Sequence, residues 1–288
     1  MNAPGASRHS SLHHISRLLS IACLLLSGFV PPAWADDAKL KIGGTGTTLQ
    51  TMRLLAAAFE KANPDVHVTV LSSLGSTGGI KAALADAIDV AVSARPLSDD
   101  ERARGAIAIE YGRAPLVLAV AQATGATTIT TAQLLEIYAG KPVLWPDGDQ
   151  VRVVLRPAAD VNTLILKGIS PQMAAVITSA EKRPGMLFAL TDQEALEHLE
   201  KVPGALVSTS LSEVVARAPL VTALKLDGKE PTPAALADGS YPLFHTFFLV
   251  RGKTPSAPAT KFVEFVLSEP GRKILAATGH LLSRANPS

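Results

Sequence analysis

The amino-acid sequence predicts an α/β fold built in two parts, and three observations support this prediction. Expected strands and helices alternate along residues 40–101, with a glycine-rich loop after each of the first two strands. The alternation restarts after a continuous apolar segment at residues 114–121. A second long apolar segment, residues 241–250, precedes two helices at the C-terminus. We expect these two long strands to carry the chain into a second part and back again.

Strands are expected where apolar residues alternate or run continuously, and helices where they recur every three to four residues. The first part should contain, in order, strand 40–43, a helix from Leu49 to Phe59, strand 66–71, helix 80–87, strand 89–93 and a capped helix start at 98–101. The second part should contain strand 114–121, helix 131–139, strand 151–155, helices 171–180 and 192–201, and strand 205–208. The chain then returns through strand 241–250 to helices 258–267 and 271–277, and the sheet should be largely parallel.

The first 35 residues predict a cleavable signal peptide. Arg8 and Arg17 precede an apolar run at residues 18–30, and a small-x-small pattern ends at Ala35. The apolar run is shorter than the roughly 20 residues that a membrane-spanning helix needs. We therefore expect export to the periplasm and cleavage after Ala35.

Cys23 lies in this apolar run, so the mature protein would have neither disulfides nor thiol chemistry. Acylation of Cys23 in a lipoprotein is the alternative, although Ser20 stands where such a signal has leucine. Beyond residue 35, 25 basic residues balance 25 acidic ones. A net charge of zero creates no general attraction for nucleic acid, so affinity for an anion would depend on a few local groups.

Two loops have the character of anion-binding sites, because each joins a strand to the start of a helix. Free backbone N–H groups and the helix dipole favour negative charge at such a place. Thr47 and Thr48 in the first loop, and Ser76 and Thr77 in the second, add hydroxyl groups. Ordinary helix capping uses the same residue types, so both interpretations remain open.

Arg156 follows the expected strand 151–155, where its guanidinium group would suit a planar oxyanion. A salt bridge with a neighbour such as Asp160 is the alternative. Arg95, which follows the third strand, allows the same two interpretations.

Enzyme motifs in the sequence are incomplete. Leu49 stands where a dinucleotide-binding loop has its third glycine, and Ser76 lacks the glycine that a nucleophile elbow has two residues earlier. The histidines beyond residue 35 are scattered singly, which favours structural roles over a metal site. The sequence thus predicts a binding protein without catalytic activity, metal or cofactor.

Several segments, in order, resemble the periplasmic phosphate-binding protein family, the substrate-binding component of phosphate ABC transporters. The segments that carry the resemblance are residues 44–48, 75–81, 93–98, 135–141 with 145–148, 202–205, 241–243 and 262–282. The resemblance implies a class II periplasmic-binding-protein fold of two lobes, each a central mixed sheet flanked by helices, joined by two crossover strands. The expected lobes are residues 36–117 with 245–288, and residues 118–244.

The resemblance also places ligand contacts on this sequence by position. These are Thr48, Leu49, Ser76, Ala94, Arg156, Asp160, Asn162 and Thr163, to which the loop and arginine arguments add Thr47, Thr77 and Arg95. Two positions depart from the family. Ala94 stands where the family has an aspartate that accepts the proton of phosphate, and Asp160 stands at a serine position.

Three outcomes follow from these departures. Asp160 pairs with an arginine and leaves an ordinary oxyanion site, or Asp160 replaces the missing acceptor, or the ligand is not phosphate. We expect a monomeric receptor that captures an oxyanion, phosphate first and sulfate as an alternative, and delivers it to an ABC transporter permease. A periplasmic sensory or interaction module with this fold is the second hypothesis, and a hydrolase using Ser76 is the third.

Overall fold

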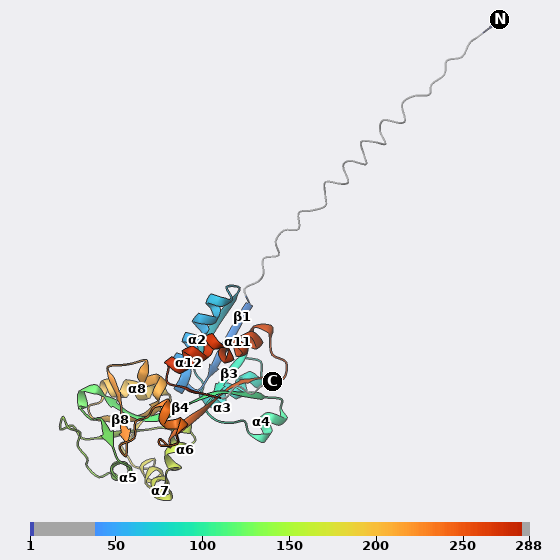
Figure 1. Cartoon of the computed structure of the whole chain (residues 1–288). Helices are drawn as coiled ribbons and strands as arrows, with labels where there is room; N and C mark the ends of the chain where they lie inside the picture. The colour runs from blue at the N-terminus through green and yellow to red at the C-terminus, as the bar shows by residue number, and fades with distance from the viewer. Residues whose placement is uncertain (3–37, 284–288) are drawn as a thin grey trace. The chain divides into compact units, whose positions relative to one another are not determined.

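The computed structural model describes residues 1–2 and 38–283 (Figure 1). The expected signal peptide, with Cys23 and the cleavage site after Ala35, lies outside the described residues except for residues 1–2. Within residues 38–283, every helix is too short or too polar to cross a membrane.

Strands and helices alternate along the chain, as the sequence predicts. The strands are β1 (Ala38–Gly44), β2 (Val66–Ser73), β3 (Val90–Ser93), β4 (Ile107–Ala121), β5 (Thr128–Ile129), β6 (Arg152–Leu155), β7 (Leu187–Phe188), β8 (Ala205–Ser210), β9 (Val221–Ala223), β10 (Lys225–Leu226), β11 (Phe244–Arg251) and β12 (Leu281–Leu282). The α-helices are α2 (Leu49–Ala62), α3 (Gly75–Leu84), α4 (Asp99–Ala103), α5 (Thr131–Ala139), α6 (Val161–Lys167), α7 (Pro171–Ala180), α8 (Asp192–Lys201), α9 (Leu211–Val215), α10 (Pro233–Ala237), α11 (Ala257–Leu267) and α12 (Glu269–Ala277). Two 3₁₀ turns are η1 (Gly46–Thr48) and η2 (Gln122–Thr124).

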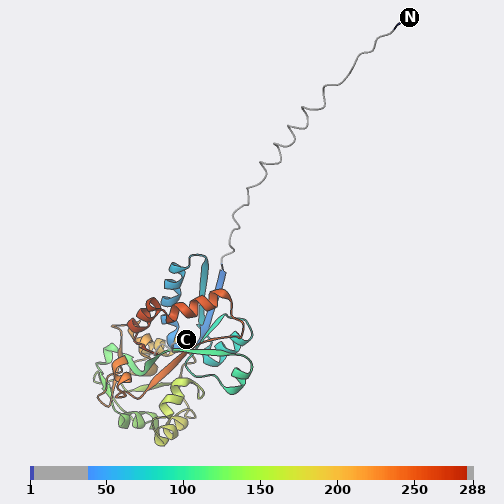
Figure 2. The same ribbon diagram turned by 45° about the vertical axis from the view of Figure 1, so that its right-hand side comes forward.

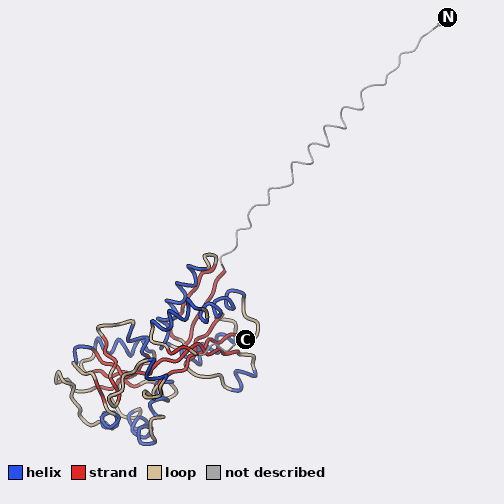
Figure 3. The backbone as a smooth tube through the Cα atoms, viewed as in Figure 1, coloured by secondary structure: helices blue, strands red, loops and turns tan. Residues whose placement is uncertain are grey.

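The long strand β4 joins two portions of one mixed sheet. The strand order is β2-β1-β3-β11-β4-β8-β6-β7, with β9 and β12 also paired to β4. The first half of β4 runs antiparallel to β11, and the second half runs antiparallel to β8 and β9. Helices flank the strands of both portions (Figure 3). β4 therefore belongs to both portions of the sheet.

Each portion of the sheet has its own hydrophobic core. Helices α2, α11 and α12 pack together over β1 and β2 (Figure 2). Phe59 of α2 contacts Phe262 of α11 edge-on. In the other portion, α5, α6 and α7 pack together and α8 packs on β8. Tyr138 and Trp145 are buried in this second core. Burial of these apolar faces stabilises both portions independently of any ligand.

Several elements match their predicted bounds. Helices α5, α7 and α8 begin and end at the predicted residues. The predicted capping box of α4 is confirmed, because Ser98 Oγ accepts from the backbone N–H of Glu101 and the Glu101 carboxylate accepts from the backbone N–H of Ser98.

Residues 75–79 were expected as a loop before a helix at 80–87, and this prediction is wrong. They already form the first half of α3, which ends at Leu84. A Cβ atom at Gly79 would lie 2.7 Å from the Cα of Gly44, so glycine allows α3 to pass close to β1. Glycine disfavours helices by its own propensity, and here close packing overrides that preference.

The mixed sheet that the family resemblance implies is confirmed, whereas the largely parallel sheet expected from the alternation of strands and helices is wrong. β4 and β11 are antiparallel to their neighbours, so the sheet is mixed. β4 begins at Ile107, well before residue 114, because this first half pairs with β11. The sequence did not indicate the earlier start, since the first half is partly exposed and lacks a continuous apolar pattern. Helix α6 was not expected, although Asp160 caps it by accepting from the backbone N–H of Asn162.

Candidate functional site

A pocket of about 230 Å³ lies where the loops after β1, β2, β3 and β6 meet. Open α/β sheets place ligands at such strand ends. Seven of the eleven residues expected at the site line it: Thr47, Ser76, Thr77, Arg95, Arg156, Asp160 and Asn162. The structure thus brings together both glycine-rich loops and both arginines, which the sequence indicated separately.

The first loop, which contains η1, is held in place by hydroxyl groups. Thr45 and Thr47 are hydrogen-bonded through their Oγ1 atoms at 2.7 Å. The backbone carbonyl of Thr47 accepts from the hydroxyls of Ser210, which ends β8, and Ser212 in α9. These bonds attach the loop after β1 to the other portion of the sheet.

Ser76 lies in the first turn of α3 and is buried. Its Oγ accepts a hydrogen bond from the backbone N–H of Ala94 at 3.0 Å. Since a hydroxyl both donates and accepts, the proton of Ser76 remains available to a ligand. The first residues of α3, 75–78, line the same pocket, and the N–H groups of a helix start favour an anion there.

Arg95 lies at the edge of the pocket in an ion pair that the sequence analysis did not identify. Its Nη1 and Nη2 donate to the two carboxylate oxygens of Glu101 at 2.9 and 2.7 Å. Nη2 also donates to Thr77 Oγ1 at 3.1 Å. Hydrogen bonding to Arg95 lowers the pKa of Glu101 to about 2, so this carboxylate stays ionised at neutral pH. Much of the charge of Arg95 is therefore already compensated.

Arg156 is the buried cation of the pocket, and its side chain is 5 % exposed. Its Nη2 donates to Asp160 Oδ2 at 2.8 Å, and its Nη1 donates to the backbone carbonyl of Ala189 at 3.2 Å. Its Nε is buried and has no hydrogen-bond partner among the described residues. The pairing of Asp160 with Arg156 corresponds to the first of the three outcomes considered for that aspartate.

Asp192 is a residue of this pocket that the sequence analysis missed. It is the first residue of α8, and its Oδ2 lies 3.4 Å from Arg156 Nη2. Its Oδ1 accepts from the hydroxyl of Thr209 at 3.2 Å. Burial raises the pKa of Asp192 from 3.8 to about 7, although Arg156 opposes this shift. The sequence analysis predicted the start of α8 correctly but did not predict the short strand β7 that precedes it. The pairing of β7 with β6 brings the start of α8 to the sheet edge where Arg156 lies, so Asp192 could not be assigned to the site without β7.

The other four expected residues do not line the pocket. Thr48 is buried and hydrogen-bonded to the hydroxyl of Tyr111 at 3.1 Å. Leu49 is fully buried in the core, and the small side chain of Ala94 is also buried. Thr163 Oγ1 donates to the backbone carbonyl of Arg156, the residue after β6, at 3.3 Å. Their observed contacts support the loops that carry the pocket.

Asn162 is held by a buried histidine on a different strand. Its Nδ2 donates to the backbone carbonyl of Ser208 at 3.0 Å, so its Oδ1 accepts from Nε2 of His245 at 2.6 Å. Burial lowers the pKa of His245 to about 3, so the ring is neutral and carries its proton on Nε2. This contact connects the start of α6 to β11.

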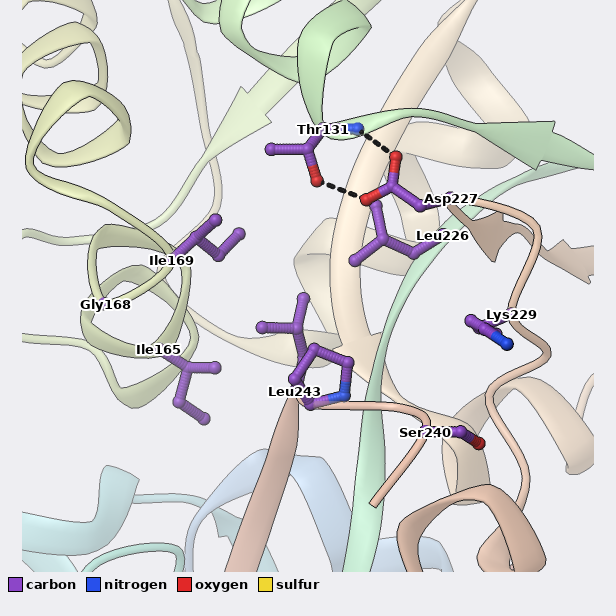
Figure 4. A pocket seen from close by; sticks show the side chains of 10 residues that line it. Thr131, Ile165, Gly168, Ile169, Leu226, Asp227, Lys229, Ser240 and Leu243 are labelled. Atoms are coloured by element: carbon purple, nitrogen blue, oxygen red, sulfur yellow. Dashed lines mark hydrogen bonds between the residues drawn. The ribbon is translucent and has the colours of Figure 1, made fainter. Parts of the chain in front are cut away.

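A second pocket, of about 450 Å³, has a mainly apolar lining that includes Ile165, Ile169 and Leu243 (Figure 4). Its carboxylate, Asp227, is bonded through both oxygens to the N–H and the hydroxyl of Thr131, at 2.9 and 2.6 Å. The pocket around Arg156 has the buried cation and the hydroxyl donors, and it is therefore the candidate functional site.

Comparisons with known proteins give a consistent result. A family model described as a PBP superfamily domain matches residues 30–270. Phosphate-binding protein PstS 2 of Streptococcus agalactiae is 25% identical over 128 residues, which are 42% of this chain and 43% of that protein. Protein SphX of Synechococcus elongatus is 32% identical over 135 residues, which are 44% of this chain and 40% of that protein. The matches span about two fifths of the length of these curated relatives.

Solved structures are similar over more of the chain. A Clostridium perfringens protein, assigned to phosphate ABC transport as a substrate-binding protein and solved with bound phosphate, has a TM-score of 0.73 and 23% identity, covering 85% of this chain and 100% of that chain. An ABC-type phosphate transport receptor of Vibrio cholerae has a TM-score of 0.59 and 21% identity, with the same coverage of both chains. At these identities the likeness establishes the fold.

Proposed function

Since the chain belongs to the PBP superfamily, we propose that it captures a phosphate-type oxyanion in the pocket around Arg156 and delivers it to an ABC transporter. The expected fold, that of a periplasmic binding protein with a mixed sheet flanked by helices, is confirmed. This superfamily is a class of binding proteins and not a class of enzymes. We therefore also propose that the pocket binds without chemical turnover.

The observation that carries the proposal is the buried guanidinium group of Arg156 beside a pocket. Its Nε lacks a partner within the described part of the chain, and an unpaired buried donor is costly. An oxyanion would satisfy this donor together with the hydroxyl of Ser76 and the N–H groups at the start of α3. The names of the relatives, PstS 2 and the C. perfringens protein with its bound phosphate, support phosphate as the first compound to test.

Opposing charges limit how strongly the site attracts an anion. Arg156 already faces Asp160 at 2.8 Å, and Arg95 faces Glu101 at 2.7 Å. Each charge-assisted hydrogen bond to the ligand contributes roughly 1.5–3 kcal/mol. Binding would therefore depend on several directed donors more than on a positive field. Such a site recognises the shape and hydrogen-bonding groups of its ligand.

The function also implies movement and location. We propose that residues 36–117 with 245–288 form one lobe and residues 118–244 the other, with β4 and β11 as the connection that bends when the lobes close. Closure would remove water from the anion and strengthen its hydrogen bonds. The protein would act as a monomer in the periplasm, after export through the expected signal peptide, and dock on a transporter permease.

Isothermal titration with phosphate, sulfate and molybdate tests the proposal. Phosphate should bind the wild type, and Arg156→Met should weaken binding by about 10- to 150-fold, because the charge-assisted bond from Nε is lost. Ser76→Ala, which removes one neutral donor, should weaken binding by about tenfold. Arg152→Met changes an exposed arginine in β6, the strand that precedes Arg156, and serves as the control.

Circular dichroism would verify that the variants are folded. The proposed function fails if the wild type binds no oxyanion at millimolar concentration, or if Arg156→Met and Ser76→Ala both bind phosphate like the wild type.

A further inference from the structure

We propose that the ligand selected by this pocket is a phosphate monoester with a small apolar substituent, and that Leu74 and Leu190 recognise the substituent. The phosphate group would bind deep in the pocket, and the substituent would lie against the two leucines on the exposed side. This inference rests on the proposed function and names the class of substrate for the same site. Inorganic phosphate would be a weaker ligand, because it fills only the polar part of the pocket.

The pocket has polar groups at depth and apolar groups on its exposed side. Ser76, Arg156 and Asp192 line it and are buried. Leu74 and Leu190 line the same pocket, but they are 42 % and 69 % exposed. This is the reverse of the usual arrangement, in which polar groups face water and apolar groups are buried. A bare anion would leave both leucines in water, whereas an apolar substituent would cover them.

The two leucines reach the pocket from distant strands. Leu74 follows β2 and Leu190 follows β7, and these strands are the two ends of the strand order. Single exposed apolar residues are common on protein surfaces and need no explanation. Here two such residues meet at one pocket, and Pro157 and Val161 line it as well. The apolar side of the pocket is therefore built from several elements of the fold.

The volume of the pocket exceeds what an oxyanion alone needs. A water molecule occupies about 30 Å³ in the liquid, so the four oxygens of a phosphate group take the place of roughly 120 Å³ of water. The pocket measures about 230 Å³. The remaining volume has room for roughly three further heavy atoms. This is the size of a short alkyl chain.

The charges around the pocket favour a neutral substituent. Asp160 and Asp192 both line the pocket, and Asp160 is paired with Arg156 at 2.8 Å. At the edge of the pocket, Glu101 is paired with Arg95 at 2.7 Å. A second negative group on the ligand would lie near these carboxylates, and the charge of both arginines is already shared. The substituent should therefore be uncharged.

Isothermal titration with methyl, ethyl and propyl phosphate tests the inference, because these ligands differ only in the length of the alkyl chain. Each added CH₂ group should tighten binding about two- to fourfold, depending on how fully it is buried. Propyl phosphate should therefore bind roughly 4- to 16-fold more tightly than methyl phosphate, and more tightly than inorganic phosphate. Glycerol 3-phosphate, which carries hydroxyl groups on a chain of the same length, should bind no more tightly than methyl phosphate.

Two variants locate the effect on the leucines. In Leu190→Ser and in Leu74→Ser, the ratio of the methyl phosphate Kd to the propyl phosphate Kd should fall below about twofold. Leu220→Ser is the matched control, because Leu220 is 71 % exposed and lies outside the lining of the pocket. This control should keep the ratio of the wild type. Circular dichroism would verify that the three variants are folded.

A second measurement needs no variant. The heat-capacity change of binding should be more negative for propyl phosphate than for methyl phosphate, since more apolar surface is buried. Equal affinities for methyl and propyl phosphate, tighter binding of inorganic phosphate than of propyl phosphate, or a wild-type ratio in both leucine variants would overturn the inference. Phosphate binding, and with it the proposed function, would still stand. Absence of binding by phosphate and by every monoester would overturn the proposed function and the inference together.

Discussion

Replacement of Glu101 with glutamine tests the ion pair that holds Arg95 at the edge of the pocket. Both carboxylate oxygens of Glu101 accept from the guanidinium group, at 2.7 and 2.9 Å. One of them also accepts from the backbone N–H of Ser98 at 2.8 Å. Glutamine keeps one carbonyl oxygen but presents an NH₂ group in place of the other. One donor of Arg95 would then face another donor instead of an acceptor.

The lowered pKa of Glu101 provides the magnitude of the effect. A decrease from 4.5 to about 2 corresponds to roughly 3 kcal/mol in favour of the ionised carboxylate. Water screens part of this energy, since the side chain of Arg95 is 27 % exposed. We therefore expect Glu101→Gln to lower the free energy of unfolding by about 2 kcal/mol at pH 7.

Urea unfolding followed by circular dichroism measures this loss, and its pH dependence has a definite sign. A folded-state pKa below the unfolded value gives stability that is present above pH 4.5 and is lost as the pH falls toward 2. The difference between wild type and variant should shrink by about 1 kcal/mol between pH 4.5 and 3.5.

Asp99→Asn is the matched control for Glu101→Gln, because Asp99 is in the same helix and pairs with Arg102 at 2.7 Å while remaining fully exposed. Its loss should be small beside that of Glu101→Gln, because exposed ion pairs contribute little to stability. A loss in Glu101→Gln no larger than that of this control would refute the reasoning.

Two further predictions concern stability. Burial lowers the pKa of His245 to about 3 and of His280 to about 4, so the unfolded chain takes up protons below about pH 6.5 that the folded chain does not. The stability that the neutral histidines contribute above pH 6.5 should therefore fall as the pH falls toward 4, while Asp192, whose pKa is raised to about 7, acts in the opposite direction. An identical pH dependence of the urea midpoint in the wild type and in His280→Gln between pH 7 and 5 would contradict the prediction. Gly79→Ala should cost about 1–3 kcal/mol, because its Cβ would lie 2.7 Å from the Cα of Gly44. Gly78→Ala, whose Cβ would have its nearest contact at 3.4 Å, should leave stability unchanged or raise it by up to about 1 kcal/mol. Equal melting temperatures of the two variants would show that the close approach of α3 to β1 does not require glycine at position 79.

Much of the fold could be predicted because its signals are local. Periodicity located α5, α7 and α8 to the residue, and the capping box of α4 was visible in four consecutive residues. The errors occurred where distant contacts override local preference. The glycines at 75–79 are helical because α3 packs on β1, and β4 extends to Ile107 because β11 provides its partner.

The donors of the candidate site and the carboxylate of Asp160 were predictable from the sequence, whereas the roles of Asp192 and Glu101 were not. Arg156 and the two hydroxyl-bearing loops were identified because strand ends and helix starts are marked in the sequence. The pairing of Arg95 with Glu101 was missed, although only six positions separate them, because the capping box already accounted for that glutamate.

The sequence by itself determined the order of strands and helices, the two glycine-rich loops and the presence of Arg156 at a strand end. Only the tertiary structure decided that Asp192, 36 positions away, faces this arginine, and that Gly46 leaves space for its carboxyl. The physical reason is that the periodicity and capping of a helix depend on neighbours within a turn or two. The electrostatics of a pocket depend on which helix ends the sheet brings to one edge, and long-range strand pairing alone decides that.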